Sequence, residues 1–114
     1  MTPSALDPAT DRAARRFLAL VRASYAVDGA ILFGSRARRD HHADSDADVA
    51  VLLRGRKAEF LSTKLAMADL AFDVLLETGV RVQPLPVWEE EWLNPERYPN
   101  PALLHNIARE GIRL

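Results

Sequence analysis

Two short apolar runs, each next to a polar turn, constrain the fold of this chain more than any other feature. The first run, residues 30–33, leads into Gly34-Ser35, and the second, residues 49–53, follows Asp46-Ala47-Asp48. Apolar runs of this length, bounded by turn residues, are typical of buried strands. The sequence therefore predicts two strands, one ending in a Gly-Ser turn and the other beginning with a pair of aspartates.

The two aspartates lie two residues apart in a predicted strand over residues 46–53. Side chains at i and i+2 of a strand point to the same face, so Asp46 and Asp48 would project together, as carboxylates that share divalent metal ions must. The Gly-Ser turn offers unhindered backbone N–H groups and a hydroxyl to a phosphate chain. A phosphate-binding turn beside paired carboxylates indicates phosphoryl or nucleotidyl transfer chemistry.

These elements resemble the nucleotidyltransferase superfamily that includes DNA polymerase β, and especially its minimal stand-alone members. The family pattern is Gly-Ser, a spacer, and Asp-x-Asp on a strand; here the spacer is residues 36–45. The Ser-Arg-Ala-Arg element over residues 35–38 matches as well. The resemblance is dense over residues 30–53 and fits the remaining order of elements loosely.

The resemblance implies a set of site residues and a cofactor. Asp46 and Asp48 would be the catalytic residues and would hold Mg²⁺. ATP or another NTP would place its phosphates at the Gly-Ser turn and the start of the following helix, where arginines are clustered. Those arginines could instead form a solvated helix face. The nucleotide-binding residues predicted in this way are Gly34, Ser35, Arg36 and Arg38.

Active members of the superfamily generally use a third carboxylate on a later strand. The corresponding element of the family, Val-Asp-x-Val, aligns with residues 82–85, which places Gln83 where aspartate is expected. Glutamine can bind a metal through its carbonyl oxygen, but it carries no charge and cannot act as a base. Either the enzyme is weakened or lost, or the attacking hydroxyl is activated by the metal or by another group. The other groups considered are Asp73, Glu77 and Glu89.

The resemblance favours a nucleotidyltransferase that moves AMP from ATP onto a hydroxyl of a partner protein. Stand-alone members of this kind resemble the antitoxins of two-component systems, which bind an all-helical HEPN ribonuclease toxin and silence it by attaching AMP to a tyrosine. The alternative is a catalytically silent binding module with the same fold, which neutralises a partner by occlusion. Gln83 favours the alternative, whereas the intact Gly-Ser and Asp-x-Asp elements favour the enzyme.

Charge and composition argue against several other classes of protein. A formal net charge of −1 argues against bulk electrostatic binding of nucleic acid. We expect no nucleic-acid template, because a single small domain leaves no other domain to hold a template or primer. The chain has no cysteine, which excludes disulfides and thiolate metal sites. It has no apolar stretch near the roughly 20 residues that cross a bilayer, and residues 1–7 lack the pattern of a signal peptide. We expect one cytoplasmic domain over residues 1–114.

The order of elements predicts an α/β (α+β) fold, a small mixed sheet with helices packed on one side, which is also the nucleotidyltransferase-like layout. Pro84 and Pro86 place the last strand at an edge of the sheet or place themselves at a strand end. Trp88 and Trp92 are expected on one side of a short helix, as packing residues. The predicted helices span residues 8 or 10 to 27, a short segment after Ser35, 58–78, 87–93 and 101–110. The predicted strands span residues 30–33, 46–53 and 80–85.

Two further expectations concern side chains. In the helix over residues 58–78, a helical spacing of apolar residues predicts the buried face. That face comprises Leu61, Leu65, Ala68, Phe72 and Leu75. His41 and His42 are expected in a flexible polar loop rather than in a metal site, because adjacent histidines on one loop rarely both reach a metal.

Overall fold

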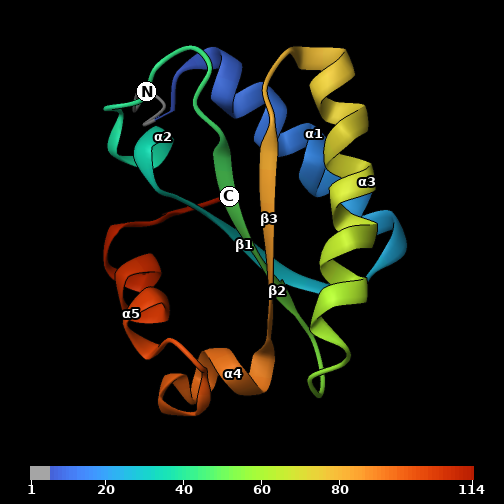
Figure 1. The fold of residues 1–114 in the computed structure, drawn as a ribbon, viewed down its shortest axis with the longest axis vertical. Coiled ribbons are helices and arrows are strands. Elements are labelled where there is room, and N and C mark those ends of the chain that lie inside the picture. The colour runs from blue at the N-terminus through green and yellow to red at the C-terminus, as the bar shows by residue number, and fades with distance from the viewer. Residues whose placement is uncertain (1–5) are drawn as a thin grey trace.

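A four-stranded mixed sheet forms the centre of the protein (Figure 1), whose computed structural model describes residues 6–114. The strand order is β3-β2-β1-β4. β1 (Val27–Phe33) pairs antiparallel with β2 (Ala47–Leu53) and with β4 (Ile112–Arg113). β2 pairs in parallel with β3 (Val82–Trp88). The predicted small mixed sheet is confirmed.

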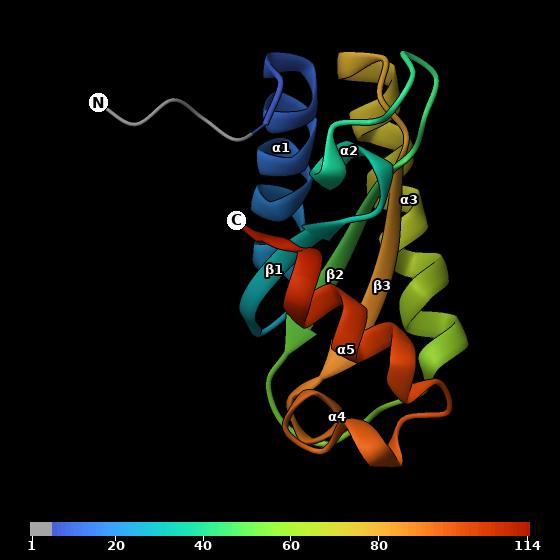
Figure 2. The same ribbon diagram turned by 90° about the vertical axis from the view of Figure 1, so that its left-hand side faces the viewer.

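Helices pack against both faces of this sheet (Figure 2). The two long helices, α1 (Pro8–Ser24) and α3 (Phe60–Thr78), share one face and form the larger apolar cluster with the strands. α5 (Pro101–Glu110) lies on the opposite face and closes a second cluster. The prediction that helices pack on one side therefore holds for the two long helices, whereas α5 packs on the opposite face. The remaining helical segments are α2 (Ser35–Arg38), α4 (Glu89–Leu93) and the 3₁₀ turn η1 (Pro95–Arg97).

The first helix begins where the sequence predicts and ends earlier. Asp7 is its N-cap and accepts a hydrogen bond of 3.1 Å from the backbone N–H of Thr10. The helix ends at Ser24 rather than at residue 27, and β1 begins at Val27. Val27 pairs with Leu53 of β2, with a register shift before Gly29. Pairing with β2 overrides the helical tendency of residues 25–27, because a β-branched residue fits a strand better than a helix end.

The predicted buried face of α3 is wrong. Leu61, Leu65 and Phe72 are between 57% and 59% exposed, whereas Met67 and Val74 are fully buried in the core. Of the remaining predicted members, Ala68 is exposed and Leu75 is half-buried. α3 carries apolar residues on two sides, so helical spacing alone cannot decide which side meets the sheet. The end of the helix is predicted correctly, since Gly79 caps it with a φ of 79°.

β3 is an edge strand, as its two prolines predict, but it runs three residues further than expected. Trp88 ends this strand and is buried in the cluster formed by α1 and α3. Trp92 follows in α4 and packs against the cluster formed by α5. Both tryptophans are packing residues, as predicted, although they serve opposite faces of the sheet. Among residues 6–114, no helix is both long enough and apolar enough to cross a bilayer.

Candidate nucleotide-transfer site

Gly34 directly follows β1, and its backbone lies against an aspartate of the neighbouring strand β2. Phe33 pairs with Asp48 in the β1–β2 ladder, and Gly34 follows with φ 78° and ψ −158°. This conformation favours glycine. A Cβ added to Gly34 would collide with the Asp48 carboxylate. Glycine is therefore required here both by the backbone angles and by the space that Asp48 occupies.

The two aspartates and Gln83, which stands where the family has a third carboxylate, converge at this end of the sheet. Asp48 lies beside Gln83 in the parallel β2–β3 register. The Gln83 amide Nε2 donates a hydrogen bond of 3.2 Å to Oδ2 of Asp46. The structure thus brings Asp46, Asp48 and Gln83 together, with the glutamine next to both carboxylates.

The electrostatics of this group favour a cation. Partial burial raises the pKa of the Asp48 carboxyl above its ordinary value, the charge of Asp46 raises it further, and Arg38 offsets part of the rise. Mg²⁺ takes oxygen ligands and is commonly held by one or two carboxylates together with phosphates and waters, so the pair of aspartates fits this ion. Within the described part of the chain, no group of three or more histidine, aspartate or glutamate side chains could hold a metal. Any metal here would rest on two carboxylates and an amide.

The short helix α2 follows Gly34 directly and determines to which side its two arginine side chains point. The backbone N–H groups of Ala37 and Arg38 both donate to the Gly34 carbonyl, at 3.1 Å. Ser35 is the first helical residue and is half-buried. The helix ends at Arg39, which takes the left-handed conformation with φ 64°. This conformation favours glycine, and here an arginine adopts it.

Arg38 lies on the side of α2 that faces the site. Its side chain is 49% exposed, and its Nε donates to Oδ2 of Asp40 at 3.2 Å. It lines a small hollow together with Gly34 and α5. The α5 residues of that hollow, which sequence reasoning did not single out, include Asn106 and Glu110. Nothing in the local sequence pattern could have found them, because α5 reaches this place only through packing of the whole domain.

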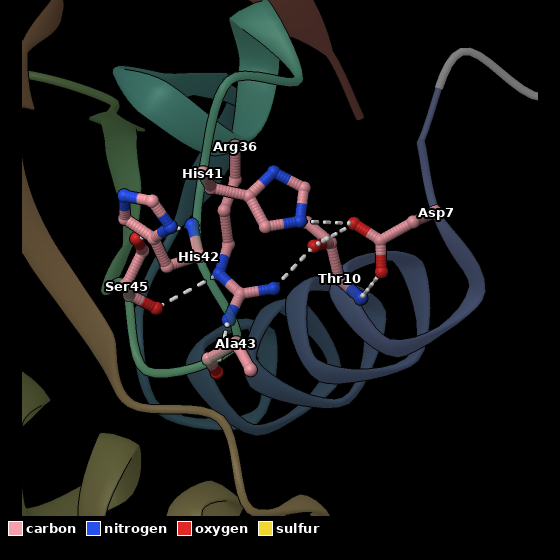
Figure 3. A network of polar contacts seen from close by, with 7 residues as sticks. All are labelled: Asp7, Thr10, Arg36, His41, His42, Ala43 and Ser45. Atoms are coloured by element: carbon pink, nitrogen blue, oxygen red, sulfur yellow. Dashed lines mark hydrogen bonds and ion pairs between the residues drawn. The ribbon is translucent and has the colours of Figure 1, made fainter.

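Arg36 does not lie where the sequence predicts. It is 2% exposed and points into the protein rather than toward the Gly-Ser turn. Figure 3 shows its guanidinium between the start of α1 and the loop over residues 39–46, where it donates to two backbone carbonyls and to the hydroxyl of Thr10. With these partners Arg36 is a structural residue in this arrangement, and the prediction that it contacts phosphate is corrected.

The sequence predicts a flexible loop between α2 and β2, but two of its residues, His41 and His42, make contacts that hold it. Nε2 of His41 lies 3.0 Å from Oδ2 of Asp7, and the His41 side chain is only 16% exposed. The backbone N–H of His42 donates to Oγ of Ser45 at 2.8 Å, while the His42 side chain is exposed. His41 is therefore part of a contact with α1 and not of a free polar loop. The only sequence signal for this contact is the capping pattern Asp7-Pro8-Ala9-Thr10.

A glycine-serine turn that leads from one strand to paired aspartates on the next, in a small mixed sheet, defines the class of nucleotidyltransferase domains. The chain belongs to the polymerase β nucleotidyltransferase family, because the family described as "Polymerase beta, Nucleotidyltransferase" matches residues 19–85. The Asp-x-Asp element, the Gly-Ser turn and Gln83 all fall within that match.

The whole fold is similar to a solved structure of the same class. The crystal structure of a "putative nucleotidyltransferase" from Sulfolobus solfataricus superimposes with a TM-score of 0.58 at 19% sequence identity. The match covers 98% of this chain and 87% of that one. At this identity the similarity establishes the fold alone. A search of curated proteins found no significant match.

Proposed function

We propose that this protein is a Mg²⁺-dependent nucleotidyltransferase that moves AMP from ATP onto a hydroxyl of a partner protein. The observation that carries the proposal is the contact of Gly34 with Asp48, beside Asp46 and Gln83. It places the Gly-Ser turn against one carboxylate, with a second carboxylate two residues away along the chain. Family membership supports nucleotidyl transfer as the reaction class.

Each residue of the site has a proposed part in the reaction. Asp46 and Asp48 would hold the metal, and Gln83 would add its amide oxygen after a turn about its last side-chain torsion. Gly34 and Ser35 would contact the phosphates, with Arg38 adding positive charge from the helix. When bound, Mg²⁺ would neutralise phosphate charge. The acceptor hydroxyl forms a bond to the α-phosphorus, the bond to the β-phosphate oxygen breaks, and pyrophosphate leaves.

The proton of the acceptor hydroxyl must go to a group other than Gln83. Glu77 is paired with Arg16 at 2.8 Å, and Glu89 accepts a hydrogen bond from the backbone of Gly55, so both have other partners. Glu110 lines the same hollow as Gly34 and Arg38. Glu110 also has a partner, since its Oε1 lies 3.5 Å from Nη2 of Arg109, but it is added to the candidates because it lines this hollow.

The proposed partner is a helical HEPN-type ribonuclease toxin, for which this protein would be the antitoxin. This proposal rests on the resemblance of the motif to minimal nucleotidyltransferases. The second candidate function is a silent binding module that neutralises the same partner by occlusion. Gln83 favours that candidate, because a neutral side chain stands beside the two aspartates where a third carboxylate would bind metal more strongly.

Transfer of label from ATP to the purified partner distinguishes the two functions. The partner to use is the helical protein encoded beside this one, if it carries an Arg-x4-His motif. We expect label on a partner tyrosine in the presence of Mg²⁺, and no label with the double variant Asp46→Asn/Asp48→Asn. Gln83→Asp should increase transfer by adding a charged ligand. Substitution of Gly34 is a poorer test, because any side chain there would also displace Asp48.

Loss of transfer has to be separated from loss of folding and of complex formation. Both variants should therefore still co-purify with the partner, since they change only the site. If the double variant protects cells from the toxin as well as the wild type does, and no modified toxin is found by mass spectrometry with either, the enzyme hypothesis is wrong and the binding module stands.

A further inference from the structure

A buried arginine links the first helix of the protein to the loop that leads into Asp46. Nε of Arg36 donates to the Ser45 carbonyl at 2.9 Å, and Nη2 donates to the Ala43 carbonyl at 3.1 Å. Nη1 donates to Oγ1 of Thr10 at 2.8 Å. A planar guanidinium presents these donors in a fixed fork, so one side chain fixes two carbonyls of the loop relative to α1.

One of these carbonyls belongs to the peptide group immediately before Asp46. The peptide group immediately after Asp46 is also held, because the N–H of Ala47 donates to the Arg81 carbonyl at 2.8 Å as β2 begins its pairing. The backbone on each side of Asp46 therefore has a protein partner. Two fixed peptide planes leave the Asp46 backbone little freedom, and the position of its carboxylate depends on both.

Thr10 connects the arginine to a carboxylate. Its hydroxyl accepts from Arg36 and donates to Oδ2 of Asp7 at 2.6 Å, and its side chain is fully buried. A hydroxyl has one proton to donate. Because that proton goes to Asp7, the Thr10 oxygen is left to accept from Arg36. A valine of the same shape would leave both the arginine and the aspartate without this partner.

Asp7 completes the connection from the other side. It caps α1 through the Thr10 N–H and contacts His41, which stands in the same loop as Ala43 and Ser45. Figure 3 shows these residues gathered between the first turn of α1 and the loop. The loop before Asp46 is thus held at two places, by Arg36 and by His41, and both contacts lead to the start of α1.

We propose that Arg36, together with Thr10 and Asp7, forms a buried clamp that positions Asp46 for metal and nucleotide binding. Arg36 is then a positioning residue that acts through the peptide group before Asp46. The metal-binding part of this inference rests on the proposed function, whereas the structural part concerns only how the loop is held. The two parts have separate readouts.

The test uses two variants that break the clamp and two matched controls. Thr10→Val removes the hydroxyl while keeping the shape of the side chain, and Arg36→Lys keeps the charge but loses the fork. Thr10→Ser is the conservative rescue. Val87→Ala truncates a fully buried residue at the opposite end of β3 from Gln83, and so lowers stability without touching the clamp.

Two measurements are made at a temperature where every variant is folded. The first is amide hydrogen exchange at Ser45 and Ala47 by NMR. The second is calorimetric titration with ATP, with and without Mg²⁺. We expect Thr10→Val and Arg36→Lys to speed exchange about tenfold or more and to weaken Mg-ATP binding by a similar factor, since each leaves buried groups unsatisfied. ATP binding in chelator should be unchanged, and both controls should bind Mg-ATP as the wild type does. Exchange in Val87→Ala measures how much of any acceleration comes from lowered stability alone.

Unchanged exchange and Mg-ATP affinity in Thr10→Val, relative to Val87→Ala, would overturn the proposal. Faster exchange with normal Mg-ATP affinity would also overturn it, because the loop would then be loosened without consequence for Asp46. If the wild type binds ATP equally with and without Mg²⁺, the proposed function fails. In that case exchange alone decides whether the clamp holds the loop.

Discussion

Arg36 and Arg38 stand two residues apart in one short helix, yet one lies inside the protein and the other at the open site. Arg36 is 2% exposed, whereas the Arg38 side chain is 49% exposed. With 3.6 residues per turn, two residues separate side chains by about 200°, so they point to opposite sides of α2. Arginines clustered beside a phosphate-binding turn can therefore differ in role: the side of the helix on which each lies decides whether it is buried or faces the open site.

The largest expected difference between the two arginines concerns stability. Arg36→Met should lower the free energy of unfolding by about 2–4 kcal/mol, because it leaves two loop carbonyls and the Thr10 hydroxyl without their donor. Arg38→Met should change it by less than about 0.5 kcal/mol, since an exposed ion pair contributes little. Urea denaturation of both variants measures the difference. Equal losses would show that the burial of Arg36 has no energetic consequence.

A smaller effect should appear as a dependence on pH at Asp7, the member of the clamp nearest to solvent. Burial alone would raise the pKa of the Asp7 carboxyl, but hydrogen bonds from Thr10 and the charges of His41 and Arg36 lower it below its ordinary value. A lowered pKa stabilises the fold above the ordinary carboxyl range, and the effect is lost as pH falls through the folded-state pKa. Asp7→Asn should therefore destabilise the protein at neutral pH, by about 1 kcal/mol.

The difference between Asp7→Asn and the wild type should shrink as the solution is acidified. Thermal unfolding of both proteins between neutral pH and the acid range tests this directly. A difference that stays constant with pH would mean that the charge of Asp7 does not contribute, and that only its capping geometry matters. Arg38→Met should leave this pH dependence in place, because Arg38 lies on the side of α2 away from Asp7.

The smallest expected effect concerns nucleotide affinity on the open side of α2. Arg38→Met should weaken Mg-ATP binding by about two- to fourfold and reduce its dependence on salt, because an exposed charge near phosphate is screened by ions. Arg39→Met is the matched control, since Arg39 is exposed in the turn that follows. Calorimetric titration at two salt concentrations measures both quantities. An equal loss for Arg39→Met would point to a general charge effect rather than to a contact made by Arg38.

Sequence reasoning succeeded where the relevant residues are close along the chain. Gly34 directly follows β1, Asp46 directly precedes β2 and Asp48 lies in β2, so their meeting follows from the pairing of two consecutive strands. The caps of the helices follow for the same reason: Asn100 and Gly79 act where residue preference predicts them. Gln83 was placed by the resemblance, and the parallel register sets it beside Asp48.

The errors concern features that depend on distant partners. Burial of Arg36 requires α1 to supply Thr10, and no pattern within residues 34–48 contains that information. α3 has two apolar sides, and the sheet selects the one with Met67 and Val74. The short strand β4 was not predicted, because two residues are too few for an alternating pattern to be visible. In each case the missing information is a contact made only after the chain has folded.

The parallel pairing of β2 with β3 has a consequence for the order in which the site is assembled. Gly34 and Asp48 can meet as soon as two consecutive strands pair, whereas Gln83 lies 37 positions after Asp46. The intervening segment includes all of α3. Closing the longer loop costs more entropy, so contacts of this kind form late in folding. The charged half of the site is thus built first, and its uncharged member arrives last.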